Sequence, residues 1–195
     1  KDIHYQEQLD LHMTFDFNVD PMSCILAHKT KDKVFYFDEV ILENATTEAT
    51  IKEILRRYPN HKGRIIINGD ASGDNRSTQS EWTNYVIIKN VLKKHYPNKP
   101  IMLAIRPFNP RIKNRIAAFN ALVCDYNGNR RLCVDKRCEK LLYNIHNLKY
   151  KPGTDIVDVP SIMSVKNENS LKYLEHPFDA ASYLVEYYFP LRLKA

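Results

Sequence analysis

The sequence predicts an α/β domain in which a mixed β-sheet, an antiparallel meander plus parallel strands, carries helices on both faces. Three observations predict this fold class. Residues 11–19 alternate strictly between apolar and polar side chains and open a series of three β-rich runs. Residues 65–67 are consecutive isoleucines, which is typical of a strand buried on both faces. Helical and strand patterns then alternate along the chain.

Length and composition favour one globular domain over residues 1–195. The chain is 44% hydrophobic and 27% charged, which is ordinary for a folded protein. It begins at Lys1 rather than at an initiator Met, so we expect a domain taken from a longer polypeptide. No apolar run approaches the roughly 18 residues that a membrane span needs, so no membrane segment is expected.

The first three strands are expected to form an antiparallel meander. The alternation at 11–19 predicts a strand with one face in the core and places Asp16 on the exposed, polar face. Two β-rich runs at 23–28 and 33–42 follow, joined by the polar turn at 29–32.

Alternating helices and strands follow the meander. Apolar residues at Ile51, Ile54, Leu55 and Tyr58 share one face of a helix over 48–58, which Pro59 ends. The remaining expected elements are a strand at 63–69, a helix at 80–96, a strand at 101–105, a helix at 111–124, a short strand at 131–134, a helix at 138–145, a polar irregular segment at 149–169, and a last helix from about 177 to 189.

The net charge of +6 hides an uneven distribution. Residues 89–151, named here the basic segment, hold 15 Lys and Arg residues and three acidic ones. The rest of the chain holds 14 basic and 20 acidic residues. A basic segment beside an acidic remainder indicates a polyanionic partner, most simply nucleic acid, although a solvated basic surface would have the same composition.

Three aspartates occupy positions that suit metal chemistry. Asp16 lies on the first strand, Asp70 follows the isoleucine strand, and Asp179 is in the first turn of the last helix. If the first and fourth strands are neighbours, these carboxylates converge, and hard divalent cations prefer such oxygen ligands. Each also has a structural interpretation: a solvated strand residue, a turn residue, and an acid that complements the helix dipole.

Three segments, in this order and spacing, resemble the nuclease domain of tailed-bacteriophage terminase large subunits. They are residues 16–21 (DFNVDP), 68–73 (NGDASG) and 176–181 (HPFDAA). The segment 106–110 (RPFNP), with Arg115 and Ile116, looks like the same family's middle portion. The resemblance runs from about residue 11 to 190.

The resemblance implies an RNase H-like (RuvC-like) fold and a metal-dependent endonuclease that cuts concatemeric double-stranded viral DNA during packaging. By motif match, Asp16, Asp70 and Asp179 would be catalytic, metal-binding acids, and His176 would assist them. Asp20 is a further candidate ligand because its position has the same parity as Asp16 along the strand. Two Mg²⁺ or Mn²⁺ ions would activate a water and stabilise the leaving oxygen.

The basic segment would then supply contacts to DNA phosphates, which position a duplex without reading its bases. The residues expected to make these contacts are Arg106, Arg111, Lys113, Arg115, Arg130 and Arg131. The family also implies portal protein and small terminase subunit as partners, and a packaging complex in the host cytoplasm. No glycine begins a Walker loop, so the ATPase motor domain is expected to be absent and no ATP site is expected.

Two other functions remain open from the residues. A different RNase H-like nuclease, such as a junction resolvase or a transposase core, would carry a similar acidic cluster. A non-catalytic DNA-binding module of the packaging machinery would carry the basic segment with a lapsed site. Cleavage of different DNA structures would distinguish the first alternative from a terminase nuclease. A test of Mn²⁺ binding would distinguish the second.

Overall fold

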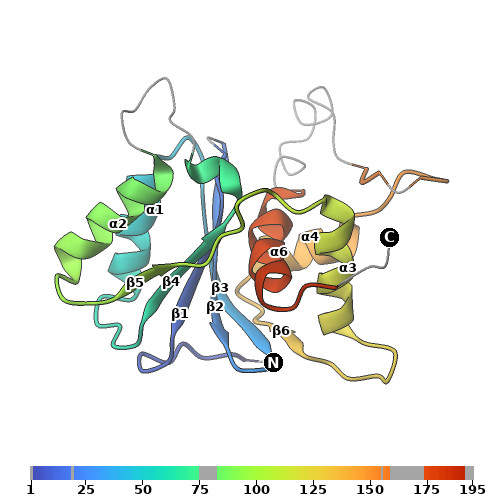
Figure 1. The fold of residues 1–195 in the computed structure, drawn as a ribbon, viewed down its shortest axis with the longest axis horizontal. Coiled ribbons are helices and arrows are strands. Elements are labelled where there is room, and N and C mark those ends of the chain that lie inside the picture. The colour runs from blue at the N-terminus through green and yellow to red at the C-terminus, as the bar shows by residue number, and fades with distance from the viewer. Residues whose placement is uncertain (1, 19, 75–82, 155, 159–173, 192–195) are drawn as a thin grey trace.

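The computed structural model describes residues 2–18, 20–74, 83–154, 156–158 and 174–191. A six-stranded mixed sheet with the strand order β5-β4-β1-β2-β3-β6 forms its centre (Figure 1). The elements are β1 (Leu11–Asp16), β2 (Met22–Lys29), β3 (Val34–Leu42), α1 (Thr47–Arg57), β4 (Ile65–Gly69), the short 3₁₀-helix η1 (Ala71–Asp74), α2 (Asn84–His95), β5 (Ile101–Leu103), α3 (Ile112–Val123), β6 (Leu132–Val134), α4 (Glu139–Asn147) and α6 (His176–Tyr188).

The sheet combines the predicted antiparallel meander with parallel strands. Strands β1, β2 and β3 pair antiparallel in sequence order, β4 and β5 add parallel strands beside β1, and β6 pairs parallel with β3. The first and fourth strands are therefore neighbours, which is the condition for Asp16 and Asp70 to approach each other. Their register pairs Phe15 with Gly69, so both strands end at the same edge.

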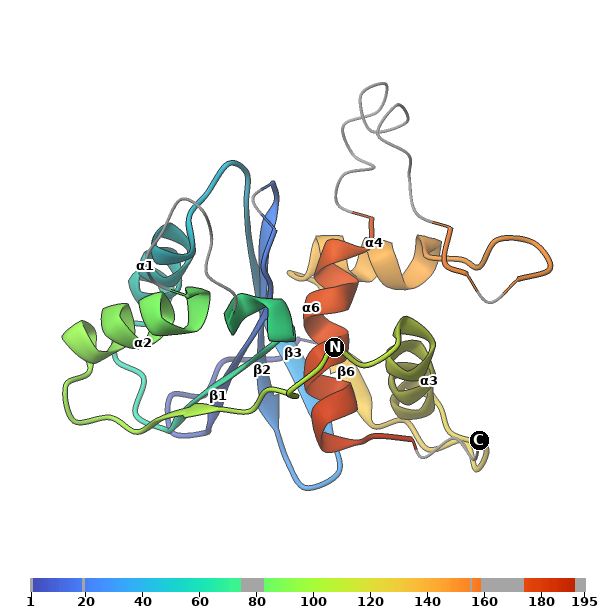
Figure 2. The same cartoon turned by 45° about the horizontal axis from the view of Figure 1, so that its top comes forward.

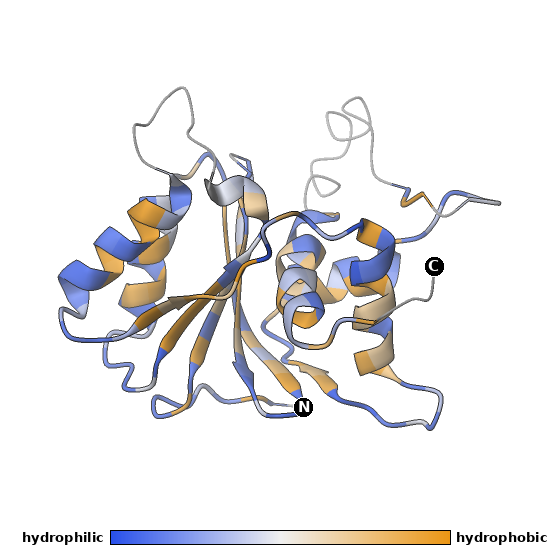
Figure 3. Cartoon of the chain, viewed as in Figure 1, coloured by the Kyte–Doolittle hydropathy of each residue, from blue (hydrophilic) through white to orange (hydrophobic). Residues whose placement is uncertain are grey.

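Helices cover both faces of the sheet, as the sequence predicts. Helices α1 and α2 lie on one face and α3, α4 and α6 on the other (Figures 1 and 2). Figure 3 shows that the apolar stretches of helices and strands face one another across these layers. One hydrophobic core lies under α1 and α2 and a second one under α6, and the isoleucines of β4 are at most 5% exposed.

The polar face of β1 is also buried, and the expectation that it is exposed is wrong. His12, Thr14 and Asp16 are at most 6% exposed because α6 packs against this face. Thr14 Oγ1 donates a hydrogen bond to the carbonyl of Ala180. The small side chains of α6 at this contact let the helix approach the sheet closely enough for that bond. The strand also ends at Asp16 rather than at residue 19.

Other boundaries differ slightly from the expected ones. Helix α2 begins at Asn84 because the Thr83 side chain accepts a hydrogen bond from the backbone of Val86 and caps it. The expected start at residues 80–82 lies outside the described residues, as does 159–169 of the irregular segment. Strand β5 ends at Leu103, before the predicted 105. None of the described helices has both the length and the apolar character that crossing a membrane requires.

Candidate active site

Asp16 and Asp70 stand at the shared edge where β1 and β4 end. Asp16 is the last residue of β1, and Asp70 directly follows Gly69 of β4. Because the parallel register pairs Phe15 with Gly69, the next residue along each strand is one of these aspartates. Neighbouring strands lie about 4.8 Å apart, so the backbone brings the two carboxylates to one place. Both residues are 6% exposed.

The chain after Asp70 folds tightly around this aspartate. Its Oδ1 accepts hydrogen bonds from Ser72 Oγ (2.5 Å) and from the backbone N–H of Gly73 (3.0 Å). The Tyr85 hydroxyl donates to the Asp70 carbonyl at 2.6 Å. A Cβ atom at Gly73 would lie 2.3 Å from the Phe17 ring, so only glycine fits there. The turn interpretation of Asp70 is thus correct, and it leaves a carboxylate at the sheet edge.

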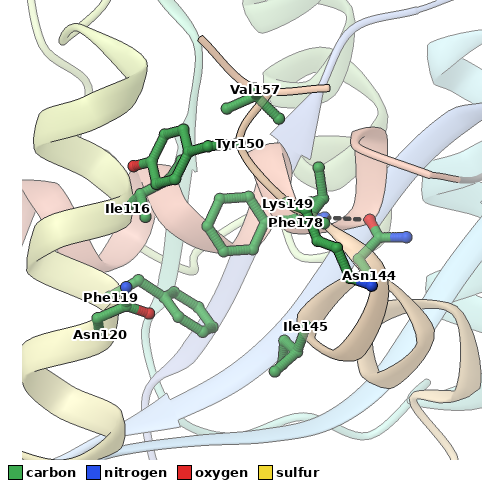
Figure 4. Close-up of a pocket in the computed structure, with 10 residues that line it drawn as sticks. Ile116, Phe119, Asn120, Asn144, Ile145, Lys149, Tyr150, Val157 and Phe178 are labelled. Carbon is green, nitrogen blue, oxygen red and sulfur yellow. Dashed lines mark hydrogen bonds between the residues drawn. The ribbon is translucent and has the colours of Figure 1, made fainter. Parts of the chain in front are cut away.

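Helix α6 brings His176 and Asp179 to the same edge, and Asn144 of α4 fixes where this helix begins. Glu175, the residue before the helix, has φ 102° and makes no side-chain cap. Asn144 Oδ1 instead accepts a hydrogen bond from the backbone N–H of Glu175 (3.2 Å). It accepts another from the backbone N–H of Phe178 (2.9 Å), which Figure 4 shows. A residue 31 positions away therefore satisfies N–H groups that a helix start leaves without partners.

A small apolar cavity lies beside this capping contact. It has a volume of about 120 Å³ and lies between α3, α4 and the start of α6. Figure 4 shows the Phe178 ring among its lining residues, with the Asn144 amide at one end. The cavity is on the side of α6 that packs against α3 and α4, so it is separate from the carboxylates.

His176 and Asn18 hold the Asp16 carboxylate. His176 Nδ1 lies 2.9 Å from Asp16 Oδ2, and Asn18 Nδ2 donates to the same oxygen at 2.5 Å. Burial by itself lowers the pKa of His176, but the hydrogen bond and the charge of Asp16 outweigh burial and raise it. The predicted assisting histidine is thus in contact with a predicted acid.

Asp179 is paired with Arg115 of α3. Arg115 Nη1 donates to Asp179 Oδ1 at 2.7 Å and to Ser182 Oγ at 2.8 Å. Burial raises the pKa of Asp179, the nearby charge of Asp16 raises it further, and Arg115 opposes both. His176, which contacts Asp16, and Asp179 lie three residues apart on α6 and so share one side of the helix, which brings the third carboxylate near the first.

The chemistry of these donors fits a hard divalent cation, because the three aspartates offer carboxylate oxygens around one sheet edge. Their present arrangement is not that of a coordination shell. Within the described ranges, no three His, Cys, Asp or Glu side chains are close enough to hold a metal ion together. Two of the three carboxylates are instead occupied by Arg115 and His176. Arg115 is bonded to Oδ1 of Asp179, and a carboxylate has a second oxygen with which it can bind a cation.

Asp20 does not lie on β1. Strand β1 ends at Asp16, so the alternation that would align Asp20 with Asp16 does not reach residue 20. Asp20 is exposed, in the turn before β2, and precedes a cis peptide bond to Pro21. The strand alternation that suggested Asp20 as a metal ligand is therefore absent at this residue.

The predicted DNA contacts differ in how far they are exposed. Arg111, Lys113 and Arg130 are exposed. Arg106 forms an ion pair with Glu186 at 3.0 Å, and Arg131 donates to the carbonyl of Ala121. The expectation fails most clearly at Arg115, which is 6% exposed and holds Asp179. A buried guanidinium in an ion pair does not present a surface to a phosphate.

Two residues of this site were not found from the sequence. Asn18 belongs to the first motif but carries no signal of its own, since asparagine is common at strand ends. Asn144 lies within a helical pattern, where nothing local indicates that its amide caps another helix. Asn18 Nδ2 also lies 2.9 Å from His176 Nδ1, and Asn144 caps α6, so both make contacts across long sequence separations that a periodicity cannot reveal.

No family model and no curated protein matches this sequence. Solved structures match it in fold. The large terminase of a thermophilic bacteriophage, in complex with ATP-γ-S, has a TM-score of 0.59 and 10% identity, covering 94% of this chain and 41% of that chain. This chain thus spans about two fifths of the thermophilic phage protein.

Two further solved structures are separate nuclease domains. The large terminase nuclease domain of bacteriophage SPP1, with bound Mn, has a TM-score of 0.50 and 16% identity, covering 91% of this chain and 85% of that chain. The P22 large terminase nuclease domain has a TM-score of 0.55 and 11% identity, covering 95% and 90%. The predicted RNase H-like fold class is therefore confirmed, and the predicted resemblance to terminase nuclease domains holds at the level of the fold.

Proposed function

We propose that residues 1–195 form the nuclease domain of a phage terminase large subunit, a divalent-metal-dependent endonuclease that cuts concatemeric double-stranded viral DNA. One observation carries the proposal: Asp16 ends β1, Asp70 directly follows the adjacent parallel strand β4, and Asp179 lies in the first turn of α6, which packs against both strands. The fold around this cluster is shared with terminase nuclease domains, one of which was solved with Mn.

In this proposal Asp16, Asp70 and Asp179 are the residues that would hold the metal, with two ions as the expected number. A bound divalent ion lowers the pKa of an attacking water and stabilises the departing 3′-oxygen. The protein's own part is to keep three carboxylates near one another, which their mutual repulsion opposes. His176 and Asn18 orient Asp16, and Arg115 holds Asp179 in place and opposes the rise that burial causes in its pKa.

Exposed residues of the basic segment would bind the DNA backbone. Arg111 and Lys113 lie around the start of α3, and Arg130 precedes β6. Contacts to phosphate position a duplex and carry no sequence information directly, so we expect little sequence preference. Their contribution is expected to fall steeply with salt because binding releases counterions.

The wider assembly follows from the same proposal. The large terminase of the thermophilic phage is longer than this chain, and the part that this chain resembles is about two fifths of it. We therefore infer a packaging machine in the host cytoplasm, in which portal protein and small terminase subunit are partners. ATP-driven movement would belong to another domain, since this chain carries no Walker loop.

Plasmid cleavage tests the proposal. Wild-type protein should nick and linearise supercoiled plasmid with Mn²⁺ and not with EDTA. Asp70→Asn should lose at least about a hundredfold in rate, since one ligand of the metal is removed. Asp32→Asn makes the same chemical change in the exposed β2–β3 turn and should leave the rate unchanged. Equal cutting by Asp70→Asn and wild type would sink the assignment.

Three measurements separate the alternatives. A comparison of linear duplex, four-way junction and RNA–DNA hybrid should show cleavage of the linear duplex, whereas strong preference for the junction would favour a resolvase. Mn²⁺ should raise the melting temperature of wild type and not of Asp70→Asn, because a ligand bound only by the native state stabilises it. No Mn²⁺ binding by calorimetry would favour a non-catalytic DNA-binding module.

A further inference from the structure

Phe108 is a large apolar side chain that is 82% exposed beside the carboxylate cluster. It lies on the segment between β5 and α3, which crosses the sheet near the end of β4 (Figure 1). Pro107 precedes it, and Pro110 follows after one intervening residue; each proline has a fixed φ angle. Single exposed apolar residues are common, so exposure alone assigns no role to Phe108.

Two anchors fix the segment that carries Phe108. On one side, Arg106 pairs with Glu186 of α6 and donates to the carbonyls of Glu186 and Tyr187. On the other side, Asn109 Oδ1 accepts a hydrogen bond of 2.6 Å from the backbone N–H of Ala71. A loop held at both ends presents its exposed ring in a defined place rather than as a mobile tip.

The second anchor locates Phe108 relative to the proposed site. Ala71 directly follows Asp70, and Asn109 directly follows Phe108. Successive Cα atoms are about 3.8 Å apart. Phe108 and Asp70 are each one residue away from this hydrogen bond, so their backbones lie close to each other. Exposed cations continue the segment at Arg111 and Lys113. An exposed apolar ring on one side and exposed cations on the other thus flank Asn109, the residue that is bonded beside Asp70.

We infer that Phe108 contacts the bases of a DNA duplex held at the carboxylate cluster, packing its ring against the base step beside the phosphate that is cut. This inference rests on the proposed function and deepens it. Arg111 and Lys113 would bind phosphate oxygens of the DNA. The Phe108 ring would enter the groove between the two DNA strands. Apolar side chains that insert at base steps unstack them partially and bend the duplex, which exposes the backbone at that point.

Binding of a duplex without metal tests the inference independently of cleavage. Fluorescence anisotropy with a labelled duplex in EDTA, at several salt concentrations, would compare wild type with Phe108→Ala. We expect the affinity to fall about fivefold or more, as for loss of a base-stacking aromatic. The slope of log affinity against log salt should not change, because no charge is removed. Phe108→Trp should retain the affinity of wild type.

Two control variants give the result its meaning. Tyr126 is an aromatic residue that is 97% exposed at the far end of α3, so Tyr126→Ala should bind as wild type does. Arg111→Gln should lower the salt slope by about 0.9, the value for one lost phosphate contact. If Phe108→Ala binds with wild-type affinity, or shows an altered salt slope, the inference is overturned. The proposed function still stands in that case, provided that the wild type binds the duplex and cleavage depends on Asp70. Absence of duplex binding by wild type would overturn both.

Discussion

Arg115 Nη1 lies 2.7 Å from Asp179 Oδ1, and the two side chains, from α3 and α6, are only 7% and 13% exposed. The guanidinium carbon also lies 4.4 Å from the centre of the Tyr183 ring, on the helix turn that follows Asp179. Arg115 therefore belongs to the carboxylate cluster rather than to the basic surface. A buried ion pair of this kind fixes the position of both partners, because either charge alone would be left without compensation.

Removal of Arg115 is the first test of this relationship. Arg115→Met leaves Asp179 buried without its partner, so the free energy of unfolding should fall by about 3–5 kcal/mol. Asp179→Asn in the same background should recover part of the loss, because the uncompensated charge is then gone. Urea denaturation in EDTA measures both changes. Arg56→Met breaks an exposed ion pair with Glu53 and should hardly change the free energy of unfolding. If Arg115→Met lowers that free energy no more than Arg56→Met does, the prediction is contradicted.

The amide of Asn144 should stabilise α6 through its start. Asn144→Ala removes the acceptor of two backbone hydrogen bonds in a buried place, and we expect a loss of about 1–3 kcal/mol in the free energy of unfolding. Asn144→Asp keeps the acceptor oxygens and should lose less. Asn147→Ala, an exposed change on the same helix, is the control. Denaturation curves for Asn144→Ala and Asn147→Ala that coincide would rule out the capping role.

His12 predicts a pH dependence of stability. Burial, with a contribution from Lys29, lowers the pKa of His12 to about 4, although the hydrogen bond with Asn68 opposes the shift. In the unfolded chain the pKa of this histidine is about 6.5. The contribution of His12 to stability is therefore complete above about pH 6.5 and is lost as the pH falls from there to about 4.

The size of this effect is about 1.4 kcal/mol for each pH unit in that window, or about 3 kcal/mol in all. Denaturation curves for wild type and His12→Gln between about pH 4 and 8 measure it, and the variant should have the shallower dependence. His4→Gln, a change at an exposed histidine, should keep the dependence of wild type. Parallel curves for wild type and His12→Gln would disprove the prediction.

Gly73 should be required for the geometry of Asp70. Gly73→Ala places a Cβ 2.3 Å from Phe17 and 2.7 Å from Tyr85, whose hydroxyl holds the Asp70 carbonyl. Displacement of these rings should lower the free energy of unfolding by about 1–3 kcal/mol. It should also lower the rate of plasmid cleavage by up to about a hundredfold. Gly128→Ala, in open space at φ +78°, should lose stability but keep cleavage. Equal cleavage by both variants would separate Gly73 from the site.

Much of the fold could be predicted because it depends on local patterns. The consecutive isoleucines at 65–67 indicate a central strand whatever surrounds them, and β4 is buried on both faces. The positions of Asp70 after a strand and Asp179 in a first helical turn also follow from neighbouring residues. The exposure of Asp16 could not be predicted in this way, since it depends on α6, which begins 160 residues later.

The sequence by itself determined the order of strands and helices, the uneven charge and the three aspartates, because each is set by residues close together in the chain. Tertiary structure alone decided what those residues touch. It covered the polar face of β1 with α6, turned Arg115 from an expected DNA contact into the partner of Asp179, and used Asn144 to cap a distant helix. The physical reason is that burial and ion pairing join groups across the fold, and alternation along a strand shows which side chains share a face without showing what packs against it.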